Sequence, residues 1–117
     1  MKGIQFYRSE SGDCPVEAFL DSLSGKQAQK VAWVLQLIEE MDIIPTQYFK
    51  KLVNTDDLWE VRVQAGNNIF RLLGFIEGDE IIILNHAFQK KTQKTPKKEI
   101  QIAESRKKNY LNRKSKS

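Results

Sequence analysis

The sequence predicts an α+β domain in which helices pack on one face of an antiparallel sheet. Apolar residues recur at helical spacing over residues 15–41, and the period changes to two from residue 58 onward. The glycine-first pairs Gly66-Asn67 and Gly78-Asp79 then divide the second part of the chain into hairpin strands. The predicted order is β-α-α-β-β-β-α, with all 117 residues in one domain.

The first part of the chain is expected to form a short strand over residues 4–7 and a short helical hairpin. Pro15 suits the first turn of a helix, with Asp13 or Cys14 as its cap. Ser24 can cap the second helix, which is expected to run to about Met41. The apolar faces are formed by Val16, Phe19, Leu20 and Leu23 in the first helix and by Ala28, Val31, Ala32, Leu35 and Ile38 in the second.

Three antiparallel strands are expected over residues 58–65, 68–77 and 80–88. If both glycine-first pairs form two-residue loops, Arg62 lies opposite Arg71, and Arg71 lies opposite His86. The reverse face then carries a coherent core layer, which supports this register. That layer consists of Trp59, Val61, Val63, Phe70, Leu72, Ile76, Ile81 and Ile83.

A last helix is expected to begin with Thr95 as its cap and Pro96 as its first residue. It should run to about Tyr110, and residues 111–117 should form a frayed basic tail.

Charge is divided unevenly along the chain. Residues 1–88 carry 8 Lys and Arg against 13 Asp and Glu, whereas residues 89–117 carry 11 against 2. A basic terminal region on an acidic body suggests a polyanionic partner, most commonly nucleic acid. The alternative is a solvated basic terminus without a partner.

Composition excludes several classes of protein. No apolar run is long enough to cross a bilayer or to act as a signal sequence, so a cytoplasmic location is expected. One cysteine and one histidine are too few for an internal disulfide or a common zinc site. No phosphate-binding glycine loop or nucleophile elbow occurs in the sequence. We therefore expect no metal, no cofactor and no membrane partner.

The predicted row of Arg62, Arg71 and His86 is the first candidate site. Like charges opposite one another in a sheet cost up to roughly 1 kcal/mol per pair, so the row calls for an explanation. One explanation is a phosphate held by two guanidinium groups, with His86 available for proton transfer. The other is that Glu60 or an acidic loop residue neutralises Arg62 and leaves a solvated face.

Lysines between the last strand and the last helix form the second candidate site. Cations at a helix N-terminus oppose the helix dipole, yet free backbone N–H groups there favour a bound anion. A soluble surface loop is the usual alternative for a lysine run. Lys50 and Lys51, which precede the hairpin strands, could reach the same face or be solvated. The lysines of the run are Lys90, Lys91, Lys94, Lys97 and Lys98.

Three segments of the sequence form a specific combination. They are Leu58-Trp59-Glu60-Val61-Arg62-Val63, Phe70-Arg71-Leu72-Leu73, and HAFQKKTQKTP from His86 to Pro96. Together they resemble the phage-derived branch of the RelE/HigB toxins, and the resemblance covers nearly the whole chain. It implies the toxin component of a type II toxin–antitoxin module. The implied partners are a helix-turn-helix antitoxin, the ribosome and mRNA.

The resemblance also implies an activity, that of a ribosome-dependent endoribonuclease (mRNA interferase) that inhibits translation. In such enzymes the 2′-hydroxyl of the message attacks the adjacent phosphate without a metal ion. Arg71 would be the main clamp on that phosphate, with Arg62 and Lys90 beside it. His86 is the candidate general acid or base, and Glu60 is the alternative base. The residues expected to bind RNA phosphates are Lys50, Lys51, Lys91, Lys94, Lys97 and Lys98.

Two other interpretations stay open from the sequence. The chain could be an RNA- or ribosome-binding module of the same fold that does not cleave. It could also be an inactive prophage remnant whose role is to bind an antitoxin.

Overall fold

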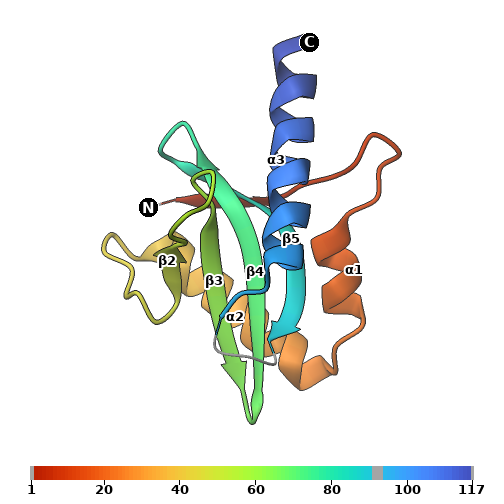
Figure 1. The fold of residues 1–117 in the computed structure, drawn as a ribbon. Coiled ribbons are helices and arrows are strands. Elements are labelled where there is room, and N and C mark those ends of the chain that lie inside the picture. Colours follow the sequence, from red (N-terminus) through yellow and green to blue (C-terminus); the bar gives the residue numbers. More distant parts are fainter. Residues whose placement is uncertain (1, 91–93, 117) are drawn as a thin grey trace.

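The chain folds into a five-stranded sheet with helices on both faces (Figure 1). The structure is a computed structural model that describes residues 2–90 and 94–116. The strands are β1 (Gly3–Phe6), β2 (Phe49–Lys51), β3 (Trp59–Ala65), β4 (Asn68–Glu77) and β5 (Ile81–Lys90). The helices are α1 (Pro15–Asp21), α2 (Gly25–Glu40) and α3 (Lys97–Lys116). No helix in this part of the chain combines the length and the apolar character needed to cross a membrane.

The sheet is mixed, where the sequence predicted an antiparallel one. The strand order is β1-β5-β4-β3-β2, and β1 pairs with β5 in parallel while the other neighbours are antiparallel. Parallel pairing needs a long connection, and the chain between β1 and β5 contains both first helices and the other three strands. The sequence also missed β2, because three residues are too few to show an alternating pattern.

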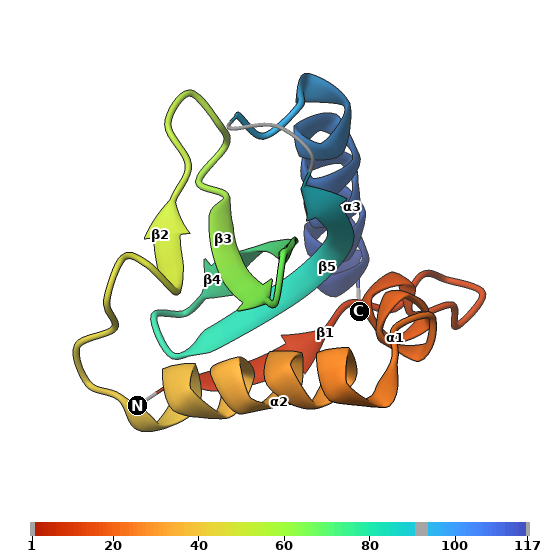
Figure 2. The same ribbon diagram turned by 90° about the horizontal axis from the view of Figure 1, so that it is seen from below.

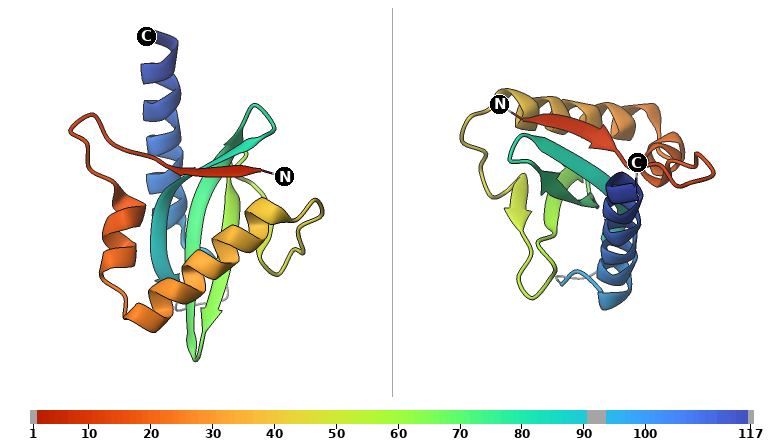
Figure 3. Two further views of the ribbon diagram at one scale, coloured as in Figure 1. Left: turned by 180° about the vertical axis from the view of Figure 1, so that it is seen from behind. Right: turned by 90° about the horizontal axis from the view of Figure 1, so that it is seen from above.

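The main core lies between the sheet and the first two helices. Figure 2 shows α2 lying along one face of the curved sheet, and Figure 3 shows it crossing the strands from behind. The buried side chains of this layer are Val16 of α1, Val31, Val34, Leu35 and Ile38 of α2, and Phe49, Val61, Val63, Phe70, Leu72, Ile82 and Leu84 of the sheet. Helix α1 packs beside β5. Both predicted helices are therefore confirmed, on one face of the sheet.

Local signals explain why the helices begin where they do. Ser24 and Gln27 form a reciprocal capping box, in which the Ser24 hydroxyl accepts from the Gln27 backbone N–H at 3.2 Å. Cys14 is the N-cap of α1, and Pro15 stands in the first turn as predicted.

Helix α3 covers part of the opposite face. Ala103 of this helix packs with Leu58, Leu73 and Phe88, and nearer the C-terminal end Tyr110 packs against Tyr7, Phe75 and Ile83. The helix begins at Lys97 and continues to Lys116, so the predicted end near Tyr110 is wrong and residues 111–116 are helical rather than frayed. Ser117 lies outside the described residues. Side-chain contacts hold its last turns: the Tyr110 hydroxyl and the Lys114 ammonium both bind Glu77, at 3.2 and 2.7 Å.

The register of the last hairpin differs from the prediction at two places. Glu77 pairs with Ile81, so the loop holds three residues rather than two, and a β-bulge follows where the register shifts between Leu73 and Gly74. As a result Arg71 lies opposite Phe88, not His86. Ile82 and Leu84 enter the main core, whereas the sequence had placed Ile81 and Ile83 there.

The register of the β3–β4 hairpin is confirmed. Arg62 pairs with Arg71, and Ala65 pairs with Asn68 across the Gly66-Asn67 loop. Gly66 has a φ of 63°, as a glycine-first two-residue turn requires.

Candidate anion-binding cleft

A cleft of about 680 Å³ opens where the sheet face that α3 leaves uncovered meets the N-terminal end of α3. A smaller hollow of about 160 Å³ adjoins it and shares four of its lining residues. The lining comprises Lys50, Leu52, Val53, Asn54, Glu60, Arg71, Lys90, Lys94, Thr95, Lys97, Ile100, Gln101 and Glu104 in the cleft, with Thr46 and Arg62 added by the hollow. Basic side chains from β2, β3, β4, β5 and the start of α3 thus converge on one space.

The two arginines of the β3–β4 hairpin form the centre of this space. Arg71 is only 5% exposed, and its Nη1 donates to the carboxylate of Glu60. The Nε atoms of Arg62 and Arg71 are buried and have no hydrogen-bond partner among the described residues. Buried donors of this kind are costly unless an acceptor satisfies them, so an anion here would be stabilised.

Glu60 is fixed from both sides of its carboxylate. It is 1% exposed, one oxygen accepts from Arg71, and the other accepts from the Thr95 hydroxyl at 2.8 Å. The acidic neighbour considered from the sequence therefore pairs with Arg71 rather than Arg62. Thr95 does not act as the predicted helix cap, because Pro96 provides the carbonyl that accepts from the Ile100 N–H at 3.2 Å.

Lysines surround this pair. Lys50 of β2 lies opposite Glu60 in the sheet register, on the same face. The pKa of Lys90 is lowered, mainly because burial disfavours its charge and also because Arg71 lies nearby. A lysine with a lowered pKa is easier to deprotonate than an ordinary surface lysine.

His86 lies in a different environment, under α3. Its Nε2 is 3.0 Å from Glu99 Oε1, its Nδ1 is 3.1 Å from Arg106 Nη1, and its ring stacks on Phe88. Burial lowers the pKa of His86, and its side chain is 12% exposed. The predicted row of two arginines and a histidine is therefore wrong, because the longer loop and the bulge move His86 two positions away from Arg71 along β5.

The other predicted residues divide into two groups. Lys50, Lys90, Lys94 and Lys97 line the cleft with Arg71, and Arg62 lines the hollow. By contrast, Lys51 forms an ion pair with Asp57 at 2.9 Å, and Lys98 and His86 do not line either space. Phe88, considered for stacking on a base, is buried beneath α3. Lys91 lies outside the described residues.

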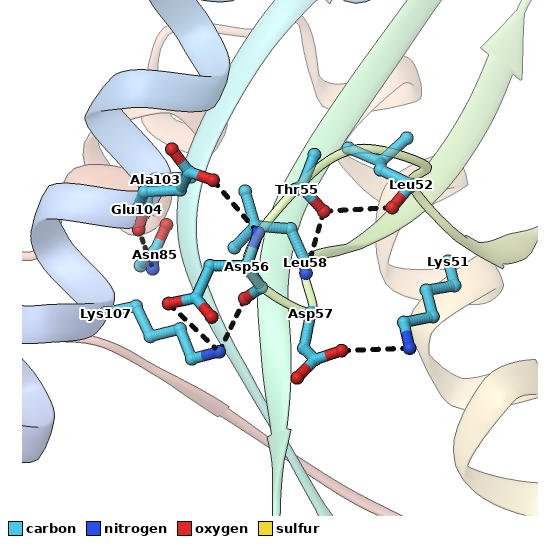
Figure 4. A network of polar contacts seen from close by, with 10 residues as sticks. All are labelled: Lys51, Leu52, Thr55, Asp56, Asp57, Leu58, Asn85, Ala103, Glu104 and Lys107. Atoms are coloured by element: carbon cyan, nitrogen blue, oxygen red, sulfur yellow. Dashed lines mark hydrogen bonds and ion pairs between the residues drawn. The ribbon is translucent and has the colours of Figure 1, made fainter.

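One wall of the cleft was missed from the sequence. It is the loop of residues 52–57, which polar contacts attach to α3 and to β2 (Figure 4). The Asp56 N–H donates to Glu104 at 3.0 Å, and Lys107 donates to the Asp56 carbonyl at 2.6 Å. Within the loop, the Thr55 hydroxyl bonds to Leu52 and Leu58. In sequence this segment looks like an ordinary polar connection, since its partners lie some fifty positions away.

Comparison with known proteins gives one family. The family model described as phage derived protein Gp49-like (DUF891) matches residues 18–108. This range includes every described strand except β1, together with most of α3. No curated protein was found to match the chain. Because the match spans more than half of the sequence, the chain belongs to the phage-derived Gp49-like family, a toxin-like family.

Proposed function

We propose that this protein is the toxin of a type II toxin–antitoxin module and cleaves mRNA on the ribosome, in the cytoplasm. The observation that carries the proposal is the convergence of Arg62, Arg71, Lys50 and Lys90 around buried, unsatisfied guanidinium donors. Membership of a toxin-like family supports the same function. A helix-turn-helix antitoxin is the proposed neutralising partner.

The proposed reaction is an internal transesterification of RNA. The 2′-oxygen loses its proton as it bonds to the adjacent phosphorus, the bond from phosphorus to the 5′-oxygen breaks, and that 5′-oxygen takes up a proton. The products therefore carry a 2′,3′-cyclic phosphate and a 5′-hydroxyl. Negative charge rises on the phosphoryl oxygens in the transition state. Arg71, held in place by Glu60, and Arg62 would stabilise that charge, an effect worth about 3–4 kcal/mol per donor in well-formed sites.

Lys90 is our candidate for proton transfer in this reaction. It lines the cleft beside Arg71, and its lowered pKa makes its proton easier to give up than that of an ordinary lysine. We do not assign this role to Glu60, because both of its carboxylate oxygens accept hydrogen bonds. We assign His86 a structural role rather than the sequence-based role of acid or base, because it contacts Glu99 and Arg106 away from the cleft.

Replacing Arg71 tests this proposal directly. We expect Arg71→Ala to abolish growth arrest on induction in a bacterium, because it removes the central phosphate clamp. Mapping of new mRNA 5′ ends should show cuts inside translated frames with the wild type and none with the variant. Lys26→Ala is the matched control, since Lys26 lies on α2 outside the cleft and its loss should leave cutting unchanged.

The alternatives have distinct outcomes in the same experiment. Growth arrest without new mRNA ends would indicate that the protein binds RNA or the ribosome and does not cleave. Absence of arrest with folded wild-type protein would indicate a remnant that only binds an antitoxin. Equal cutting by wild type and Arg71→Ala would refute the proposed site.

A further inference from the structure

The lining of the cleft combines two chemically different groups of side chains. The cations, which we call the cationic end, are Arg71, Lys50, Lys90, Lys94 and Lys97. A second group carries no charge, and the carboxylate of Glu104 lies beside it on α3. We call this uncharged group the neutral end; it consists of Leu52, Val53, Asn54, Ile100 and Gln101. A phosphate needs only the cationic end, so the neutral end requires an explanation of its own.

The neutral end is built from two segments that are fixed to each other. The loop of residues 52–57 is joined to α3 by the bonds from Asp56 to Glu104 and to Lys107, and Lys51 and Asp57 anchor its base (Figure 4). A wall held in this way keeps its shape before a ligand arrives, which lowers the entropic cost of binding.

The neutral end contains an exposed apolar side chain. Val53 is 84% exposed although it lines the cleft, and Leu52 and Ile100 are only partly buried against the cluster beneath α3. The amide side chains of Asn54 and Gln101 flank these residues, and each can both donate and accept hydrogen bonds. An unpaired base presents an apolar face, which packs against apolar side chains, and a polar edge, which forms hydrogen bonds. The neutral end offers both kinds of group side by side.

We propose that the neutral end is a subsite for an unpaired nucleobase of RNA, next to the phosphate bound at the cationic end. The inference rests on the proposed function and adds the part of the substrate that selects the cut position. The cleft volume of about 680 Å³ falls in the usual range for small-molecule sites, roughly 300–1,000 Å³, and so accommodates a nucleotide rather than a phosphate alone.

Binding of mononucleotides to the wild-type protein tests the subsite, since they contain no internucleotide bond to cleave. The probes are the four nucleoside 3′-monophosphates, with ribose 5-phosphate and inorganic phosphate as base-free controls, measured by NMR titration. We expect at least one nucleotide to bind about tenfold more tightly than either base-free probe, which corresponds to one productive base contact.

Two exposed apolar residues provide matched variants. Val53→Ala should weaken nucleotide binding several-fold without changing the affinity for inorganic phosphate. Ile43→Ala should change neither, because Ile43 is equally exposed, at 86%, but does not line the cleft. Gln101→Ala should alter the order of affinities among the four nucleotides.

The outcomes separate this inference from the proposed function. Equal affinities for nucleotides and base-free probes would overturn the base subsite and leave the phosphate site standing. Unchanged nucleotide binding by Val53→Ala would also overturn it. Failure of every probe, inorganic phosphate included, would contradict both the subsite and the proposed catalytic cleft.

Discussion

At the scale of single residues, the hydrogen bonds of His86 determine which ring nitrogen carries the proton. The Arg106 guanidinium can only donate, so Nδ1 must accept, and the proton therefore resides on Nε2 and points to Glu99. Arg106 also donates to the Asn85 carbonyl at 2.8 Å, which fixes the guanidinium beside the ring. This arrangement suits a neutral imidazole and agrees with the lowered pKa of His86.

The stability of the protein should therefore depend on pH through His86. Its folded-state pKa lies below the ordinary value of 6.5, mainly because of burial, so the unfolded chain binds the proton more readily. The stability that comes from keeping His86 neutral is fully present above pH 6.5 and is lost as the pH falls through the folded-state pKa. Thermal unfolding between about pH 7.5 and pH 5.5 should show a falling midpoint in the wild type and a flatter profile in His86→Gln. Parallel profiles would contradict this account.

At the scale of elements, features that depend on neighbours in sequence were predictable, and features that depend on tertiary contacts were not. The capping box at Ser24 and the two-residue Gly66-Asn67 turn involve neighbours in sequence, so α2 and the β3–β4 register followed from the residues alone. The β4–β5 register depends on a bulge near Asn85, whose side chain donates to the Ala103 carbonyl of α3. Nothing beside Asn85 in sequence reveals that contact, and the bulge together with the three-residue loop caused the error in placing His86.

The close approach of β4 and β5 at Gly74 gives an element-scale prediction. A Cβ added at Gly74 would collide with the backbone of Ile83 and Leu84, and backbone atoms cannot move aside as a side-chain end can. Gly74→Ala should destabilise the fold by about 1–3 kcal/mol or more, as overpacking does. Urea unfolding provides the measurement. Gly3→Ala is the control, because a Cβ there would meet nothing within 4 Å, and equal midpoints for the two variants would disprove the steric argument.

At the scale of the whole molecule, the two faces of the sheet differ in what they carry. The main core with α1 and α2 lies on one face, and α3 lies on the other (Figure 2). Residues of that second face and of α3 line the cleft. The charge asymmetry of the sequence suggests a polyanionic partner, and this stays a prediction. The pairing of Arg62 with Arg71 was predictable and is confirmed. The contribution of β2 and of the 52–57 loop to the cleft was not predictable, since both depend on packing across the sheet.

Salt dependence of RNA binding provides a test at this scale. Six basic side chains and the carboxylates of Glu60 and Glu104 line the described cleft and its hollow. After allowance for the two carboxylates, these side chains can neutralise about four phosphates. That number gives a slope near −3 when the logarithm of the RNA-binding constant is plotted against the logarithm of the salt concentration for single-stranded RNA. Fluorescence anisotropy with an RNA whose 2′-oxygens are methylated would measure it without cleavage. Arg62→Ala should make the slope shallower by about 0.7, and a slope near zero in the wild type would exclude phosphate contacts as the main source of affinity.

The attachment of the 52–57 loop to α3 also has an evolutionary consequence. The contacts that hold this wall use backbone groups of Asp56 and side chains of α3, whereas Val53, Asn54 and Gln101 belong to none of the buried clusters. Substitutions at Val53 and Gln101 change the lining of the cleft without removing a core contact, whereas Asn54, with a φ of 58°, is restricted by its left-handed backbone conformation. Descendants of this sequence can therefore vary the lining of the cleft at these two exposed positions, with little selection against such changes from folding.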